Sequence, residues 1–285
     1  MAESIFEAYN KIKKELAAAG IEDCVFEAKQ IIKHITGYSN AQILSHYNDK
    51  LTAFQQNNIT AIIKQRLIRY PLQYIIGSWG FYGREFAVGP GVLIPRADTE
   101  FLIDACKELL VGKASPEIID LCTGSGCVGI TLGCEYPKAN VMLVEKFPEA
   151  TRYAYKNIID NGAENVLLTE GDIFEGVCTD KKYDLIVSNP PYISDSEMET
   201  VSPEVKFEPE TALKGGRDGL DFYRVILEKY TTCLNLGGGV AFEVGIGEAA
   251  AVAELMKNAG IENVKIKQDL NGIDRVVFGT LKSVQ

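Results

Sequence analysis

The stretch EIIDLCTGSG, residues 117–126, decides the fold because it joins an apolar run directly to a glycine-rich turn. Short apolar runs of this kind form buried β-strands, and Gly124 and Gly126 let the backbone come close to a ligand. The helix that follows would present unpaired N–H groups to that ligand. No Gly-Lys-Ser/Thr follows the turn, which excludes a P-loop. Taken alone, the turn is equally compatible with a tight strand–helix connection that binds nothing.

The apolar runs downstream repeat this strand–helix pattern. They are NVMLVE (140–145), NVLLTE (165–170), YDLIVSN (183–189) and GGVAFEV (238–244). Because stretches of helical length separate most of them, they predict an α/β fold with a mostly parallel sheet covered on both faces. Only a short turn separates NVKIKQD (263–269) from DRVVFGT (274–280). This pair predicts a hairpin that ends the sheet with an antiparallel strand.

The first 70 residues have a different character and predict a small bundle of helices. Capping boxes, in which a Ser or Thr is followed three residues later by Glu or Gln, begin at Ser4 and Thr52. Asp23 and Ser39 are candidate N-caps of two helices between them. The spacing of apolar residues within these segments is helical rather than alternating.

Aromatic residues alternate with glycines between the helical region and the α/β region. The alternation includes Trp79 and Phe86 and predicts a β-hairpin that joins two domains. The predicted division is therefore a helical domain over 1–70, a hairpin linker over 71–95 and an α/β domain over 96–285.

The composition is that of an ordinary globular protein, with 285 residues of which 46% are hydrophobic and 24% charged. This excludes a collagen-like, low-complexity or wholly disordered chain. No apolar run approaches the ~20 residues that cross a bilayer, and the N-terminus lacks the apolar core of a secretory signal. The seven cysteines form no CxxC pair, so we expect reduced thiols, a cytoplasmic protein, no membrane association and no bound metal.

Charge is distributed unevenly along the chain. Lys and Arg number 29 against 39 Asp and Glu, a net charge of −10. Residues 1–70 carry a net charge of +2, and residues 71–285 carry −12. A phosphate backbone binds mainly through Lys and Arg, so the acidic body argues against a nucleic-acid substrate, although a local basic groove would still permit one.

Acidic residues follow the two strands after the glycine-rich turn. Glu145 lies 19 residues after Gly126, a spacing at which a carboxylate accepts hydrogen bonds from both hydroxyls of a ribose. Asp172 lies just beyond the next predicted strand. Together with the turn, these residues predict a cofactor that contains a nucleoside.

The tetrapeptide Asn189-Pro190-Pro191-Tyr192 follows a buried strand and carries a second kind of chemistry. Two prolines end the strand and fix a rigid turn at the sheet edge where open α/β sheets bind ligands. The Asn189 side-chain carbonyl and the Pro190 backbone carbonyl are then two convergent acceptors, with the Tyr192 ring as a flat face beside them. This arrangement suits a planar –NH₂ group, either an amide or the amine of a base. A plain turn with a capping Asn and a packed Tyr is the alternative.

These motifs together resemble the S-adenosylmethionine-dependent amino-methyltransferases, and other segments resemble one family among them. The segments are PLQYIIG (71–77), VLIPRADTE (92–100), EPETAL (208–213) and GGRDGLDFYR (215–224), all similar to stretches of the HemK/PrmC family. That family comprises the protein-(glutamine-N5) methyltransferases of peptide chain release factors. The resemblance covers essentially the whole chain. The tetrapeptide alone is shared with DNA adenine methyltransferases, whereas the flanking segments are more specific.

The resemblance implies a fold, a reaction and a set of site residues. The fold is a Rossmann-like class I methyltransferase domain with a seven-stranded sheet, and the N-terminal helical domain would dock the substrate. The reaction is methylation of the glutamine side-chain nitrogen in the Gly-Gly-Gln motif of class 1 release factors, with S-adenosylhomocysteine as the second product. The catalytic residues are Asn189, Pro190 and Tyr192, with Pro191 also contacting the substrate. The cofactor residues are Asp120, Cys122, Thr123, Gly124, Ser125, Gly126, Glu145, Asp172, Phe174 and Asn189.

A few positions depart from the family pattern or stay undecided. The family usually has Gly where this chain has Cys122, whose side chain could weaken cofactor binding or require a backbone shift. It commonly has Asp at Glu145 and Pro at Ala97, and neither change removes a group that the reaction needs. Phe174 is equally compatible with packing on an adenine and with a core position. Arg96 could face either the cofactor pocket or the acidic sheet edge.

Other functions fit part of this pattern. A glutamine methyltransferase of a ribosomal protein has the same tetrapeptide, and the N-terminal segment favours the release-factor branch. A nucleic-acid amino-methyltransferase requires a flipped base and a basic channel, which the charge of residues 71–285 disfavours. A non-catalytic S-adenosylmethionine sensor has no need of the tetrapeptide. A nicotinamide-dependent oxidoreductase explains the glycine-rich turn and leaves the tetrapeptide without a role.

Overall fold

The computed structural model describes residues 2–177 and 181–282, which fold as two compact units. The first comprises Met1–Gly77 with Pro203–Phe207, and the second comprises Ser78–Ser202 with Glu208–Gln285. The division thus falls at Gly77 and not at residue 70, and a short segment from far downstream joins the helical unit. Across the described residues, each helix is too short or too polar to span a membrane.

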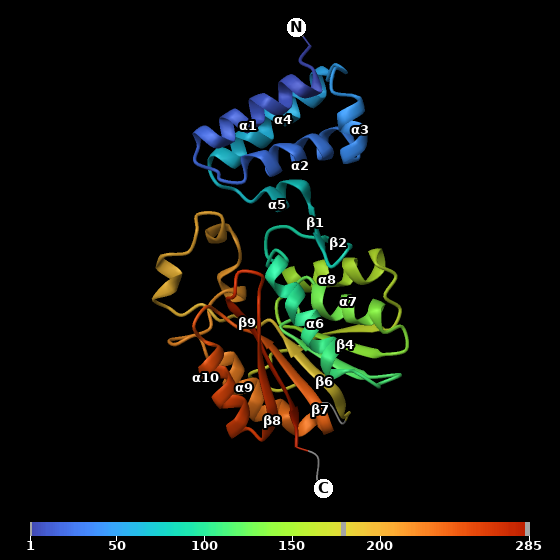
Figure 1. Cartoon of the computed structure of the whole chain (residues 1–285), viewed down its shortest axis with the longest axis vertical. Helices are drawn as coiled ribbons and strands as arrows, with labels where there is room; N and C mark the ends of the chain where they lie inside the picture. The colour runs from blue at the N-terminus through green and yellow to red at the C-terminus, as the bar shows by residue number, and fades with distance from the viewer. Residues whose placement is uncertain (1, 178–180, 283–285) are drawn as a thin grey trace. The chain divides into compact units, whose positions relative to one another are not determined.

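The first unit is helical, as predicted. Its helices are α1 (Ile5–Ala18), α2 (Cys24–Thr36), α3 (Asn40–Ser45), α4 (Ala53–Leu67) and α5 (Leu72–Ile76) (Figure 1). The capping boxes at Ser4 and Thr52 are confirmed, and Ser39 opens α3 with a third. Asp23 precedes α2 but makes no side-chain capping bond, so that predicted role is wrong. Its backbone (φ −82°, ψ 28°) is not in the extended conformation that directs an N-cap side chain to the helix.

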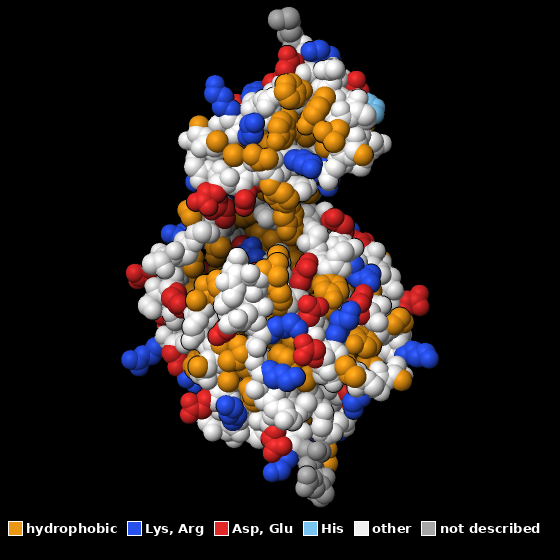
Figure 2. Space-filling view, in the orientation of Figure 1, with side chains coloured by type: hydrophobic (Ala, Val, Ile, Leu, Met, Phe, Trp, Pro, Cys, Tyr) orange, Lys and Arg blue, Asp and Glu red, His pale blue; other side chains and the backbone are white. Residues whose placement is uncertain are grey.

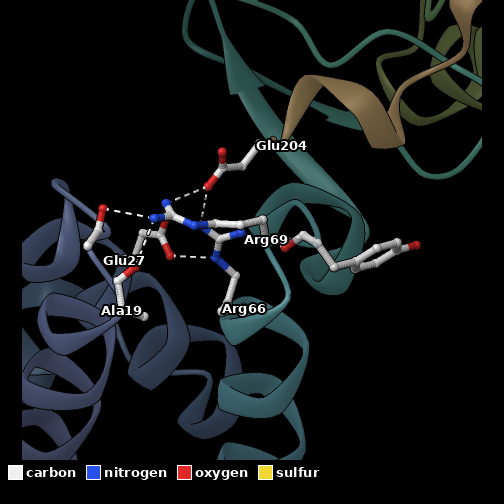
Figure 3. A network of polar contacts seen from close by, with 7 residues as sticks. Ala19, Glu27, Arg66, Arg69 and Glu204 are labelled. Carbon is white, nitrogen blue, oxygen red and sulfur yellow. Dashed lines mark hydrogen bonds and ion pairs between the residues drawn. The ribbon is translucent and has the colours of Figure 1, made fainter. Parts of the chain in front are cut away.

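A buried arginine ties the downstream segment Pro203–Phe207 into the helical unit. Arg66 is only 2% exposed, and its guanidinium donates to both carboxylate oxygens of Glu27, at 2.7 and 2.8 Å. Glu204 Oε1 accepts from Arg66 Nη2 at 3.4 Å and from Arg69 Nη1 at 3.1 Å, as Figure 3 shows. A buried charge is costly unless it is paired. Glu204 therefore contributes to the fold of a unit whose α-helices all precede it by more than 120 positions.

The second unit begins with a hairpin and continues as an alternation of strands and helices. The hairpin is β1 (Ser78–Phe81) with β2 (Arg84–Ala87), which is shorter than the predicted linker because Leu72–Ile76 is helical. The sheet strands are β3 (Glu117–Leu121), β4 (Asn140–Glu145), β5 (Val166–Glu170), β6 (Tyr183–Ser188), β7 (Leu234–Glu243), β8 (Ile261–Gln268) and β9 (Asp274–Leu281). The α-helices are α6 (Glu100–Leu109), α7 (Cys127–Glu135), α8 (Pro148–Asp160), α9 (Asp221–Tyr230) and α10 (Ala249–Asn258). Single 3₁₀ turns of this unit lie at Ala97–Thr99, Glu197–Glu199, Glu210–Ala212 and Thr231–Cys233, and another, at Val205–Phe207, belongs to the first unit.

The strands form one seven-stranded sheet in the order β5-β4-β3-β6-β7-β9-β8. Strands β3 to β7 pair in parallel, as the strand–helix alternation predicted. The last strand, β9, runs antiparallel to both β7 and β8, so the predicted terminal hairpin is confirmed. In the sheet, however, β9 inserts between β7 and β8, and β8 occupies the edge.

Alternate residues of the central strands pack on opposite faces of the sheet, which have separate cores. Ile118 and Leu185 pack with residues of α6 and α7, whereas Ile119 and Ile186 pack with residues of α9 and α10. Figure 1 shows these helix pairs on the two sides of the sheet. Strands buried on both faces must be apolar throughout, which explains why they appear in the sequence as continuous apolar runs.

Candidate active site

A cavity of about 260 Å³ lies where parallel strands β3, β4 and β6 end in the second unit. Most of the residues predicted to bind the cofactor line it. They are Asp120, Cys122, Thr123, Gly124, Ser125, Glu145, Asp172, Phe174 and Asn189. The motifs that lie far apart in the sequence thus surround one space. Gly126 lies outside the lining and instead forms the N-cap of α7 in the left-handed conformation.

Asp120 stabilises the glycine-rich turn through hydrogen bonds to the turn and to the start of α7. Its Oδ2 accepts hydrogen bonds from the Thr123 hydroxyl at 2.5 Å and from the Gly129 N–H at 2.9 Å. Burial raises the pKa of Asp120 to about 7, against the opposing effect of these two donors. Both contacts are internal to the turn and the start of α7, so Asp120 shapes the cavity through its neighbours.

Glu145 connects the turn after β3 to the end of β4. Its carboxylate accepts from the backbone N–H groups of Gly124 at 2.8 Å, Lys146 at 2.9 Å and Phe147 at 3.0 Å. Burial raises the pKa of Glu145, and these three N–H donors oppose that effect. A carboxylate has about four lone-pair sites, so one acceptor position remains after these bonds. Because Glu145 lines the cavity, that position suits a ligand hydroxyl.

Asp172 and Phe174 form another part of the cavity wall. Asp172 accepts from Phe174 N–H at 2.9 Å and pairs with Lys146 Nζ at 2.7 Å. The Phe174 and Phe222 rings form a T-shaped pair with 5.0 Å between centroids, and Phe174 remains 42% exposed. This exposure excludes the core position that the sequence left open for Phe174.

Asn189 follows β6 directly and lines the cavity, with its Nδ2 donating to Thr99 Oγ1 at 3.3 Å. Among the residues that the structure describes, Pro191 also lines the cavity, whereas Pro190 and Tyr192 do not. The Tyr192 hydroxyl donates instead to Glu243 Oε1 at 3.3 Å. Within the tetrapeptide, Asn189 therefore borders the cavity, whereas Tyr192 packs away from it against Glu243.

A second glycine-rich segment locks the backbone of the tetrapeptide. Ile193 N–H donates to Leu213 O at 2.8 Å, and Gly215 N–H donates to Ile193 O at 2.9 Å. A Cβ atom added to Gly215 would lie 2.6 Å from the Tyr192 Cα and 2.8 Å from the Pro191 carbonyl oxygen. Only glycine permits this close approach of two backbones.

Arg96 lines the cavity, which is the first of the two positions left open for it, and its carboxylate partner belongs to a loop rather than to the edge of the sheet. Its guanidinium contacts Glu208, which is buried and accepts from Ile94 N–H at 3.0 Å. Sequence reasoning assigned no role to Glu208, Thr99 or Glu243. All three are buried polar residues, and buried polar groups ordinarily have a specific partner. For Glu243, its position at the end of a buried strand could have indicated such a role from the sequence.

Comparison with known proteins gives the relationship of the chain. Residues 7–77 match the model of the PrmC N-terminal domain, and residues 97–212 match that of the methyltransferase small domain. The chain is 38% identical over 267 residues to a release factor glutamine methyltransferase of Geobacter sulfurreducens, covering 93% of each protein. It is 37% identical over 255 residues to one of Thermodesulfovibrio yellowstonii, covering 88% of this chain and 91% of the relative. The chain belongs to the release factor glutamine methyltransferase family.

Solved structures agree with this family assignment at the level of the fold. The hMettl16 catalytic domain superimposes with a TM-score of 0.59 at 15% identity, covering 87% of this chain and 94% of that one. A methyltransferase from Pyrococcus furiosus gives 0.52 at 18% identity, covering 82% and 100%. The second unit therefore has the class I S-adenosylmethionine-dependent methyltransferase fold, in agreement with the predicted fold class.

Cys122 adopts a left-handed backbone conformation with φ of 59°, a region that favours glycine. A side chain in that conformation costs about 1–2 kcal/mol, partly offset by the lower chain entropy of a non-glycine residue in the unfolded state. We expect Cys122→Gly to raise the free energy of unfolding by about 1 kcal/mol, measured by chemical denaturation. Cys122→Ala removes the sulfur but keeps the strain, so an equal gain in both variants would contradict this explanation.

Proposed function

We propose that this chain transfers a methyl group from S-adenosylmethionine to the side-chain amide nitrogen of the glutamine in the Gly-Gly-Gln motif of class 1 release factors. The observation that carries the proposal is that Asn189 opens into the same cavity as the glycine-rich turn and Glu145, in a chain of this family. The match of residues 7–77 to the PrmC N-terminal domain favours a release factor over a ribosomal protein as the substrate.

The residues around the cavity fit S-adenosylmethionine. Glu145 keeps an acceptor position for a ribose hydroxyl, and the exposed ring of Phe174 offers a flat apolar face for an adenine. Thr123, Gly124 and Ser125 would surround the methionine part, and Asp172 would accept from the adenine amino group. When bound, S-adenosylmethionine supplies an electrophilic methyl group on its sulfonium.

The proposed mechanism depends on orienting a poor nucleophile. The lone pair of an amide nitrogen is delocalised into its carbonyl group. The side-chain carbonyl oxygen of Asn189 and the backbone carbonyl oxygen of Pro190 would accept hydrogen bonds from the two N–H groups of the substrate amide. These bonds would orient the amide nitrogen and raise its electron density. Such positioning contributes ~7–11 kcal/mol in favourable cases, and carbonyl dipoles stabilise the positive charge that develops on nitrogen. When the N–CH₃ bond forms and the S–CH₃ bond breaks, the amide nitrogen carries a positive charge, and this cation is acidic enough to lose its proton to water without a dedicated base.

The helical unit is proposed to bind the release factor away from the reacting glutamine. It exposes large apolar side chains, and Figure 2 shows apolar surface on its visible face. These side chains are Phe6, Val25, Phe26, Leu44, Phe54, Leu67 and Ile68.

We also propose that the protein acts in the cytoplasm, because its proposed substrate is a translation factor. Each described cysteine is a free thiol, and Cys178 lies outside the described residues.

Transfer of labelled methyl from S-adenosylmethionine tests the proposal. The acceptors are a class 1 release factor, its Gln→Ala variant, a Gly-Gly-Gln peptide, a ribosomal protein substrate and duplex DNA. We expect label on the intact factor, none on the Gln→Ala variant, and a higher KM for the peptide because it lacks the contacts made to the helical unit. Label only on DNA or only on the ribosomal protein would show that the substrate is not a release factor. Cofactor binding without any methyl transfer would favour a non-catalytic sensor.

A further inference from the structure

Thr99 occupies a helix-capping position but does not cap. It is the N-cap residue of α6, where a Thr hydroxyl ordinarily accepts from a backbone N–H in the first turn. No such bond forms, because Thr99 has the αR backbone conformation (φ −65°, ψ −17°) of the 3₁₀ turn that precedes α6, and its hydroxyl is free for another contact. Thr99 is 2% exposed, and its Oγ1 accepts from Asn189 Nδ2 at 3.3 Å.

Glu243 lies behind Thr99 at the end of β7. Glu243 is 3% exposed, and its Oε1 accepts from the Tyr192 hydroxyl. Among the described residues, Oε2 is buried and has no hydrogen-bond partner. The Thr99 hydroxyl lies near this carboxyl group, although no hydrogen bond to Oε2 is formed: burial raises the pKa of Glu243 to about 7, and the Thr99 and Tyr192 side chains oppose this rise. When Glu243 is ionised, a buried carboxylate oxygen without a partner is costly, so the hydroxyl hydrogen of Thr99 is then best directed at Glu243.

This direction of the Thr99 hydrogen determines the orientation of the Asn189 amide. With its hydrogen given to Glu243, Thr99 Oγ1 offers only lone pairs to Asn189 and can pair with Nδ2 but not with Oδ1. The amide then turns Oδ1 away from Thr99 and leaves it free to accept from a substrate. The opposite orientation would present N–H groups to the N–H groups of the substrate amide.

We propose that Thr99, with its hydroxyl held by Glu243, is a positioning residue that fixes the side-chain amide of Asn189 with its oxygen available to the acceptor amide. The inference rests on the proposed function, because it assumes that the acceptor is an –NH₂ group. It adds Thr99 and Glu243 to the residues on which the reaction depends, although neither needs to touch the reacting atoms.

Thr99→Val and Thr99→Ser test the role of the hydroxyl. Valine has the shape of threonine without the donor and acceptor, so we expect kcat to fall about tenfold or more with the release factor, while the cofactor Kd changes less than about twofold. Serine keeps the hydroxyl and should restore most of the rate. Thr131→Val is the matched control, because Thr131 is also buried and its hydroxyl has no partner among the described residues. Wild-type kcat in Thr99→Val, or an equal loss in Thr99→Ser, would overturn the proposal.

Glu243→Gln tests the direction of the relay. A glutamine that keeps its oxygen on Tyr192 directs its –NH₂ group toward Thr99, which then accepts and turns its own hydrogen toward Asn189. We expect kcat to fall about as far as in Thr99→Val, and the double variant to lose little more, because both act through one amide. Losses that multiply in the double variant would show two independent effects and contradict the relay.

A measurement without an acceptor separates this inference from the proposed function. The side-chain amide NMR signal of Asn189 is identified by its absence in Asn189→Asp. We expect its protons to exchange about tenfold faster in Thr99→Val than in the wild type, with protection retained in Thr99→Ser. If the wild type methylates no release factor, the proposed function fails, and this pattern still establishes the positioning. Equal exchange in all three proteins overturns the positioning whatever the substrate is.

Discussion

Replacing Asn189 with alanine is expected to lower methyl transfer to the release factor by about 10²–10³-fold, the size of effect seen when one preorganised dipole is removed from an active site. The Asn189 side chain opens into the cavity at the end of β6 and supplies one of the two proposed acceptors for the substrate amide. Without it, the amide nitrogen loses both its orientation and the carbonyl dipole that stabilises positive charge. The measurement is kcat with labelled S-adenosylmethionine and the intact factor.

Cofactor affinity is the control for this variant. The glycine-rich turn is held by Asp120 and Glu145, whereas the side-chain amide of Asn189 is hydrogen-bonded to Thr99. We therefore expect calorimetry to give a cofactor Kd within a few-fold of the wild type. Unchanged turnover in Asn189→Ala would exclude the proposed mechanism. A large loss of cofactor binding would instead make Asn189 mainly a cofactor residue.

Most of the α/β unit could be predicted from the sequence because its strands are buried on both faces. Such strands are apolar along most of their length, so runs such as EIIDLC and YDLIVSN can be recognised as buried strands from this one sequence. The carboxyl ends of adjacent parallel strands meet at one edge of the sheet. Glu145 ends β4 and Asn189 follows β6, on either side of β3, and the cavity includes both.

Features that depend on tertiary contacts between distant segments could not be predicted. Nothing local in the sequence indicates that Glu204 joins the helical unit, because its partners Arg66 and Arg69 lie more than 130 residues upstream. Thr99 resembles an ordinary helix cap in sequence, and only the fold shows that its hydroxyl meets Asn189. The left-handed backbone conformation of Cys122 could not be predicted from the sequence either, because cysteine seldom adopts positive φ.

The tetrapeptide depends on the segment that packs against it, and Gly215→Ala tests that dependence with the second largest effect we expect. Gly215 is not among the glycines with positive φ, so the alanine backbone itself is unstrained. Its Cβ, however, would lie 2.6 Å from the Tyr192 Cα and 2.7 Å from the Gly219 carbonyl oxygen, and a backbone must move to admit it.

A displacement of about 1 Å at a positioned group can lower a rate by about 10²-fold, and overpacking costs about 1–3 kcal/mol of stability. We expect Gly215→Ala to lose kcat on this scale while the cofactor Kd stays within a few-fold, since the turn at residues 122–126 is held by other contacts. Gly80→Ala is the matched control, because its Cβ would meet no atom closer than 3.9 Å. Wild-type kcat in Gly215→Ala would mean that the tetrapeptide tolerates movement, and the positioning argument for Asn189 and Thr99 would then fail with it.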